Sequence, residues 1–207
     1  MKAKSQVEIK VSREQSPAEA ANIATERTAR SPMFLGMIFF LISEAFLFGS
    51  LFWTYYYLRA ENPVWPPAGV HLDLPLASIN TFILLVSSLT IWLAGEAIQK
   101  VRRNGLALGL AATIILGATF LAITIFEWTQ ESFRPWTSAY GSVFYTLTGF
   151  HALHVFGGVV LLLSLLTRTL KGRITPANFS PIGIGSLYWH YVDFIWIIVF
   201  TTLFIVR

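Results

Sequence analysis

The stretch MFLGMIFFLISEAFLFGSLFWTYYYL, residues 33–58, is almost entirely apolar or aromatic, yet it contains the carboxyl group of Glu44. A helix rises about 1.5 Å per residue and the hydrocarbon core of a bilayer is about 30 Å thick, so about 20 apolar residues can cross it. Four more such runs follow, at residues 76–98, 106–128, 139–166 and 184–206. Their length is helical, and they lack the ten-residue alternation of a membrane β-barrel. The sequence therefore predicts an all-α membrane protein, a bundle of five transmembrane helices.

The composition of the chain agrees with this prediction. Of the 207 residues, 55% are hydrophobic and 13% are charged, whereas a soluble domain has about 25% charged residues. The chain has no cysteine, which excludes disulfides, thiolate zinc sites and covalent haem attachment through a C-x-x-C-H motif. The basic residues form short clusters beside the apolar runs, so a nucleic-acid partner is not expected.

The positive charges predict the orientation of the bundle. Twelve of the 15 Lys and Arg residues lie before the first run, between the second and third runs, or between the fourth and fifth. Cytoplasmic segments of membrane proteins are enriched in Lys and Arg, so we expect a cytoplasmic amino terminus and an outer carboxyl terminus. Residues 1–31 have mixed charge and few large apolar side chains. We expect them to form a poorly ordered cytoplasmic tail, with residues 32–207 as the membrane domain.

Ionisable side chains inside the apolar runs are the candidate functional residues. They are Glu44 in the first run, His151 and His154 in the fourth, and His190 and Asp193 in the fifth. Glu44, His154 and Asp193 reach similar depths of about 14 to 18 Å below the inner boundary. An ionised carboxylate at a helix centre costs about 2.5–3.5 kcal/mol, so each carboxyl group should be protonated or face a histidine of a neighbouring helix.

Each of these residues has a structural and a functional interpretation. Asp193 with His190 is either a polar clamp between helices or a participant in proton movement. Glu44 either makes a buried hydrogen bond or has a proton-handling or partner-facing role. His151 and His154 have the spacing of two metal or haem ligands, but two ligands make a poor site. We therefore favour neutral imidazoles that bond to carboxylates or carbonyls.

Other polar and aromatic residues lie at the ends of the runs. Glu127, beside Trp128, is expected at the outer boundary or in contact with the proline-rich loop 59–75. Trp65 in that loop is typical of the headgroup level. The remaining candidates for the lipid interface are Trp53, Tyr57 and Arg59.

Several stretches in the same order resemble subunit III of the haem-copper respiratory oxidases, that is, cytochrome c oxidase subunit III in its short five-helix bacterial form. They are SEAFLFGSLFWTYYY (43–57), WPP (65–67), SINTFILLVSS (78–88), FEW (126–128), YGSVFYTLTGFHALHVFGG (140–158) and YWHYVDFIWIIVF (188–200). The resemblance implies that Glu44 is the intramembrane glutamate that reacts with carbodiimides in related chains. It assigns the remaining members of a polar framework to His151, His154, His190, Asp193 and Glu127.

The resemblance also implies a function. Subunit III of this family is a non-redox accessory subunit of a proton-pumping terminal oxidase in the bacterial plasma membrane, which oxidises cytochrome c and reduces oxygen to water. It packs on the catalytic haem-copper subunit I, in a complex with the copper-bearing subunit II, supports proton uptake and protects subunit I from inactivation during turnover. Haem and copper are thus expected in the partner subunits and not on this chain. Seven-helix members hold phospholipid beside two leading helices, so bound phospholipid is expected here if another subunit supplies those helices.

Residue counts support a non-redox role independently. A catalytic haem-copper subunit needs about six histidine ligands, and only three of the four histidines here lie inside the runs. Alternatives within the family are subunit III of a quinol oxidase and a homologue associated with nitric oxide reductases. An independent proton-coupled transporter, with Glu44, Asp193 and the histidines as a relay, should show inverted repeats, and we find no internal symmetry.

Overall fold

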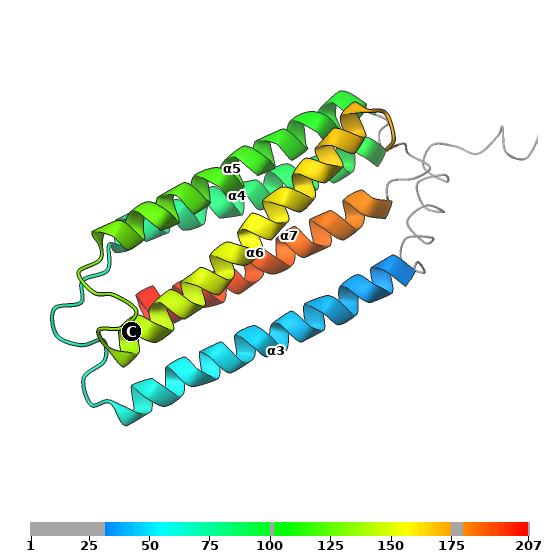
Figure 1. Cartoon of the computed structure of the whole chain (residues 1–207). Helices are drawn as coiled ribbons and strands as arrows, with labels where there is room; N and C mark the ends of the chain where they lie inside the picture. The colour runs from blue at the N-terminus through cyan, green and yellow to red at the C-terminus, as the bar shows by residue number, and fades with distance from the viewer. Residues whose placement is uncertain (1–31, 100–101, 175–179, 207) are drawn as a thin grey trace, which may run out of the picture.

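The described residues of the computed structural model are 32–99, 102–174 and 180–206, and they form five long helices (Figure 1). The helices are α3 (Pro32–Glu61), α4 (Leu74–Gln99), α5 (Arg103–Gln130), α6 (Ala139–Leu170) and α7 (Ser180–Phe200), and α7 continues into a π-helical turn, η1 (Thr201–Ile205). Each of the five is long and apolar enough to cross a membrane. The predicted all-α bundle of five membrane-spanning helices is confirmed, whereas the predicted tail, residues 1–31, lies outside the described residues.

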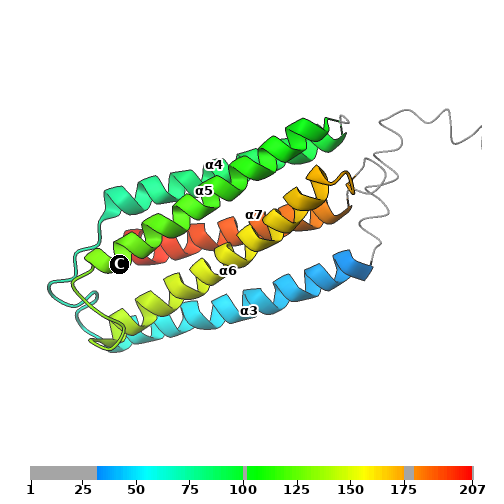
Figure 2. The same cartoon turned by 45° about the horizontal axis from the view of Figure 1, so that its top comes forward.

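The helices are arranged with α6 and α7 in the middle. The α4–α5 hairpin lies on one side of them and α3 lies on the other (Figures 1 and 2). The two helices of the hairpin pack closely against each other, and α3 packs chiefly against α6 and α7. As a result, α3 is attached to the rest of the bundle along one side only.

The attachment of α3 is a narrow seam. Its buried residues recur every seven positions: Leu41, Phe48 and Tyr55. Seven residues are almost two helical turns, so these side chains lie on one face of the helix. The other faces carry exposed aromatic residues such as Phe46 and Trp53, which is the surface expected of a helix in contact with lipid or with another protein.

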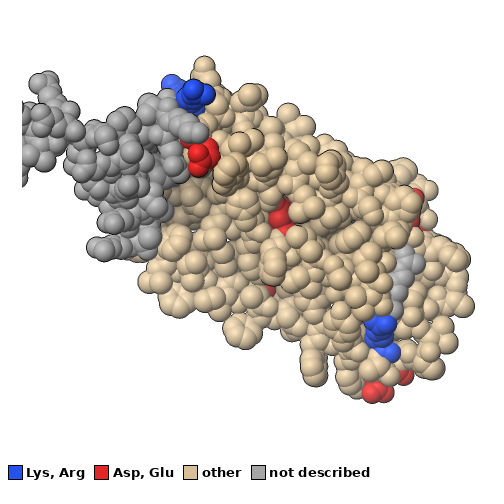
Figure 3. Space-filling model, turned by 180° about the vertical axis from the view of Figure 1, so that it is seen from behind, with Lys and Arg blue, Asp and Glu red and all other residues tan. Residues whose placement is uncertain are grey.

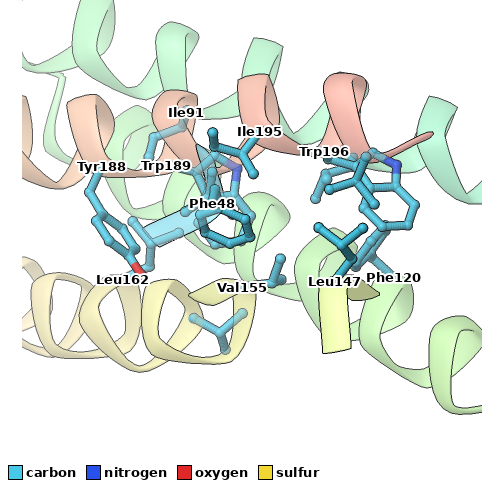
Figure 4. Packing of buried hydrophobic residues seen from close by; sticks show 14 of the residues in the cluster. Phe48, Ile91, Phe120, Leu147, Val155, Leu162, Tyr188, Trp189, Ile195 and Trp196 are labelled. Carbon is cyan, nitrogen blue, oxygen red and sulfur yellow. The ribbon is translucent and has the colours of Figure 1, made fainter. Parts of the chain in front are cut away.

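The centre of the bundle is built around Trp189 of α7, which is fully buried (Figure 4). Gly117 of α5 and Gly158 of α6 make room for its indole ring. A Cβ atom at Gly117 would lie 2.6 Å from the ring, and one at Gly158 would lie 2.8 Å from it. The indole N–H donates a hydrogen bond of 2.9 Å to Ser87 Oγ of α4. Small residues allow membrane helices to approach closely, and here they let one side chain contact three neighbouring helices.

Arg103, at the start of α5, caps the end of α6. Its Nε donates to the backbone oxygen of Thr169 at 2.8 Å, and its Nη2 donates to the backbone oxygen of Leu170. The last carbonyl groups of a helix have no intrahelical partner and carry partial negative charge, so a guanidinium group stabilises them.

Candidate functional site

Glu44 and His154 join α3 to α6 near the middle of both helices. Glu44 Oε2 lies 2.9 Å from His154 Nε2, and the two side chains are only 15% and 14% exposed. His154 Nδ1 lies 2.7 Å from the backbone carbonyl oxygen of Phe150. Glu44 therefore faces a histidine of a neighbouring helix, which is one of the two alternatives that the sequence predicted for this carboxyl group.

One proton lies between Glu44 and His154. A carbonyl oxygen can only accept a hydrogen bond, so His154 Nδ1 must carry a hydrogen. If Nε2 is bare, Glu44 must be protonated in order to donate to it. If Glu44 is ionised, Nε2 carries a second hydrogen and the ring is an imidazolium. Both forms have zero net charge, so the pair lies inside the membrane without an uncompensated charge.

Aromatic side chains enclose this pair. The Tyr188 hydroxyl of α7 donates to the backbone oxygen of His154 at 3.0 Å, and the Phe48 ring lies edge-on to the imidazole, with centroids 5.1 Å apart. The Tyr191 hydroxyl is buried and has no hydrogen-bond partner among the described residues, and Glu44 is close enough to affect it electrostatically. Groups from α3, α6 and α7 thus meet at one position.

A second polar cluster joins α4 to α7. Ser88 Oγ donates to Asp193 Oδ2 and lies 3.0 Å from His190 Nδ1. Among the described residues Asp193 thus has no direct histidine partner, because the Ser88 hydroxyl lies between its carboxyl group and His190. Ser88 could not be predicted as part of this cluster, because the sequence does not distinguish a serine with a specific partner from other small residues in an apolar helix. The geometry is that of a polar clamp between two helices.

His151 belongs to neither cluster. Its ring is fully buried, with centroids 5.7 Å from Phe120 and 4.7 Å from Trp196. Neither of its nitrogens has a hydrogen-bond partner in the described part of the chain. The expected hydrogen-bonded imidazole is observed for His154, whereas among the described residues the ring of His151 contacts only aromatic side chains in the interactions that the structure shows. Within the described ranges, no group of three or more His, Asp or Glu side chains could hold a metal ion.

Acidic side chains gather where α5 meets the loop before α4. Glu127 is partly buried near the end of α5, and Glu131 follows it by one helical turn. Asp73, in the proline-rich loop, lies close enough to affect both electrostatically. Burial, and then the negative charge of Asp73, raise the pKa of Glu131 to about 7. Glu127 therefore lies near the proline-rich loop, in an acidic cluster with Glu131 and Asp73 that the sequence did not predict.

The Glu131→Gln variant should be more stable than the native chain at pH 8 and equally stable at pH 4. Below pH 4.5 the carboxyl group is protonated in both the folded and the unfolded state. As the pH rises to about 7 the unfolded state ionises first, so the folded state loses stability that glutamine would retain. Because Glu131 is only half-buried, solvent screening reduces the expected gain at pH 8 to about 1 kcal/mol.

Free energies of unfolding in detergent micelles at the two pH values measure this difference. The exposed Glu61, at the end of α3, provides the matched control in the Glu61→Gln variant. An equal gain from Glu131→Gln at pH 4 and pH 8 would contradict the assignment.

The predicted lipid-interface residues divide into two groups. Three of them lie on α3 near its carboxyl-terminal end and are exposed or partly exposed: Trp53, Tyr57 and Arg59. Trp65 instead packs toward the bundle, with its ring 5.4 Å from that of Tyr55 and 5.1 Å from that of Tyr140. Its indole nitrogen is buried, so this side chain closes the end of the core and does not face outward.

Comparisons with known proteins identify the family of this chain. The family model of cytochrome c oxidase subunit III matches residues 14–206. Cytochrome c oxidase subunit 3 of Thermostichus vulcanus is 37% identical over 91% of this chain and 95% of its own length. The probable cytochrome c oxidase subunit 3 of Nocardia farcinica is 40% identical over 84% of this chain and 87% of its own length. The horse (Equus caballus) subunit is 35% identical over 82% of this chain and 67% of its own length. On this evidence, the chain belongs to the cytochrome c oxidase subunit III family.

Proposed function

We propose that this chain is a non-redox accessory subunit of a proton-pumping terminal oxidase that oxidises cytochrome c and reduces oxygen to water. The observation that carries the proposal is the match of almost the whole chain to proteins named cytochrome c oxidase subunit 3. The proposed location is a bacterial membrane, the plasma membrane, and the bacterial origin of two relatives supports this part of the proposal. The distribution of Lys and Arg supports a cytoplasmic amino terminus.

The proposed partners are the catalytic haem-copper subunit, the copper-bearing subunit and membrane lipids. In this proposal haem and copper belong to the partner subunits, and this chain contributes packing surface and buried polar groups. Large exposed apolar side chains on all five helices support a role in contacts within the membrane. Bound phospholipid beside the chain is part of the proposal.

The proposed role of Glu44 follows from its pairing with His154. The pair can shift its shared proton between Oε2 and Nε2 without changing net charge. Taking up a second proton, or losing the shared one, would leave a charge in a largely buried site. The pair is therefore suited to hold one proton near the middle of the membrane and to keep α3 attached, while the adjacent catalytic subunit takes up protons for oxygen reduction.

Purification of the tagged chain from native membranes in a mild detergent tests the proposal. We expect it to copurify with several polypeptides that together show haem absorbance and oxidise reduced cytochrome c. A complex that oxidises a quinol and not cytochrome c would instead favour the quinol-oxidase alternative. A colourless chain with no copurifying subunit would contradict an accessory role.

A further inference from the structure

His190 lies on an outward-facing stripe of α7. Positions 183, 187, 190, 194 and 197 follow one another at three- or four-residue intervals and so share one side of the helix. Phe194 and Ile197 on this stripe are 58% and 43% exposed. Figure 3 shows the side of the bundle that lies behind α5 and α6 in Figure 1, and between its ends this side carries few charged side chains, apart from isolated Asp or Glu patches. A half-buried histidine is unusual on such a surface.

Neighbouring side chains extend the stripe into a surface. Leu85 and Trp92 of α4 lie one turn before and one turn after Ser88, and they are 44% and 54% exposed. We call the α4–α7 face the surface formed by Leu85, Ser88, Trp92, His190, Phe194 and Ile197. It combines apolar ridges with one polar position, about 15 Å along α7 from its first residue.

The hydrogen bonds around Ser88 define the polarity of that position. The single hydroxyl hydrogen of Ser88 is donated to Asp193, so Ser88 Oγ accepts from His190 Nδ1. A neutral imidazole with hydrogen on Nδ1 has a bare Nε2, which is an acceptor. His190 Nε2 has no hydrogen-bond partner within the described ranges, and unlike the two nitrogens of His151 it is not buried in the bundle. The α4–α7 face therefore presents an acceptor within the apolar run of α7, about 9 Å from the start of that run at residue 184.

The hydrocarbon around His190 Nε2 limits which kinds of molecule can contact this acceptor. Acyl chains have no hydrogen-bond donor, and a polar atom left unsatisfied in hydrocarbon is costly. At this depth a protein partner must be helical, because other backbone conformations would expose unsatisfied peptide groups to lipid. A two-fold contact with a second copy, centred on His190, would place two Nε2 acceptors against each other. A helix from a different subunit, with a donor side chain, satisfies all of these conditions.

We infer that the α4–α7 face docks a transmembrane helix of the catalytic oxidase subunit, whose hydroxyl, amide or indole group donates a hydrogen bond to His190 Nε2. This inference rests on the proposed function, since it identifies the surface through which the accessory subunit would bind. The Ser88–His190–Asp193 cluster then links the partner helix to the clamp between α4 and α7.

Photo-crosslinking in the assembled oxidase tests the position of the surface. Benzoylphenylalanine is introduced singly at Phe194 and at Trp92 on the face, and at Ile115 on α5 as a control of similar exposure, 65%. We expect the first two positions to crosslink to the catalytic subunit at least about tenfold more than Ile115. Crosslinking from Ile115 alone, from Phe194 to a second copy of this chain, or from Phe194 to no protein would overturn the inference.

A His190→Leu variant tests the hydrogen bond. Interhelical hydrogen bonds in membranes contribute on average about 0.6 and at most about 1.7 kcal/mol, so the variant should dissociate from the purified oxidase about 3-fold and at most about 18-fold faster. The matched control is His71→Leu in the exposed loop, which should dissociate like the native chain. Equal dissociation of His190→Leu and His71→Leu would refute the contact, and unfolding of the isolated variant shows whether the bundle itself is intact.

Different experiments test the proposed function and the inferred docking surface. If the native chain does not copurify with haem, the proposed function is wrong. If it copurifies but the crosslinks map to another face, only the inferred docking surface is wrong.

Discussion

Replacing Trp189 by alanine is expected to lower the free energy of unfolding of the bundle by about 3 kcal/mol. The side chain is fully buried between Gly117 and Gly158, and two glycines cannot fill the space that the indole would leave. The substitution also removes the hydrogen bond to Ser87 and leaves that hydroxyl without its donor. Lipid chains are themselves apolar, so the loss comes from packing and hydrogen bonding and not from transfer to water.

Unfolding in mixed detergent micelles measures this effect against a matched variant. Trp53 of α3 is 76% exposed, so Trp53→Ala removes the same group from the surface of the bundle. We expect this control to change stability by no more than about 0.5 kcal/mol. Equal losses from the two substitutions would show that Trp189 is not the centre of the packing.

The Glu44→Leu variant should lose about 2–3 kcal/mol of stability. Leucine leaves His154 Nε2 without a partner in a largely buried site. Because α3 is attached to the bundle through a single face, few other contacts can compensate for the lost hydrogen bond to His154. The loss of stability should therefore appear first as release of α3 from α6. Glu44→Gln should lose less, because its amide group can donate to a bare Nε2. Unfolding measurements on both variants, with proteolysis to report the release of α3, distinguish these outcomes.

The sequence predicted the membrane-spanning elements well because their length is a physical requirement. The first apolar run, 33–58, lies inside α3, which extends to Glu61. The fifth run begins at residue 184, whereas α7 already begins at Ser180. These differences arise because hydropathy detects the part of a helix within the hydrocarbon, while the helix itself continues into the headgroup region.

The partners of the buried polar groups were only partly predictable. Depth along the helix indicated that Glu44 and His154 lie at the same level, and they are indeed paired. Depth does not give the rotation of each helix about its axis, so it could not show that His154 contacts Glu44 while His151 lies between aromatic rings. That choice depends on where α3 packs against α6, which is a tertiary property.

Hydroxyl side chains were missed for a related reason. Ser88 and Tyr188 are compatible with a membrane helix whether or not they have a specific partner, so their presence gives no signal of its own. Trp65 was expected at the headgroup level, and its inward position depends on the path of the loop that carries it. In each case local sequence allowed several environments, and packing selected one.

The coupling energy between Glu44 and His154 tests most directly the claim that intramembrane charged groups pair inside this bundle. It is obtained from the unfolding free energies of the native chain, Glu44→Leu, His154→Leu and the double variant. We predict a coupling of about 2 kcal/mol, with the double variant more stable than the two single losses would imply, because leucines can replace a buried pair at little cost. Additive losses, with a coupling near zero, would mean that the two groups do not depend on each other and would contradict the account.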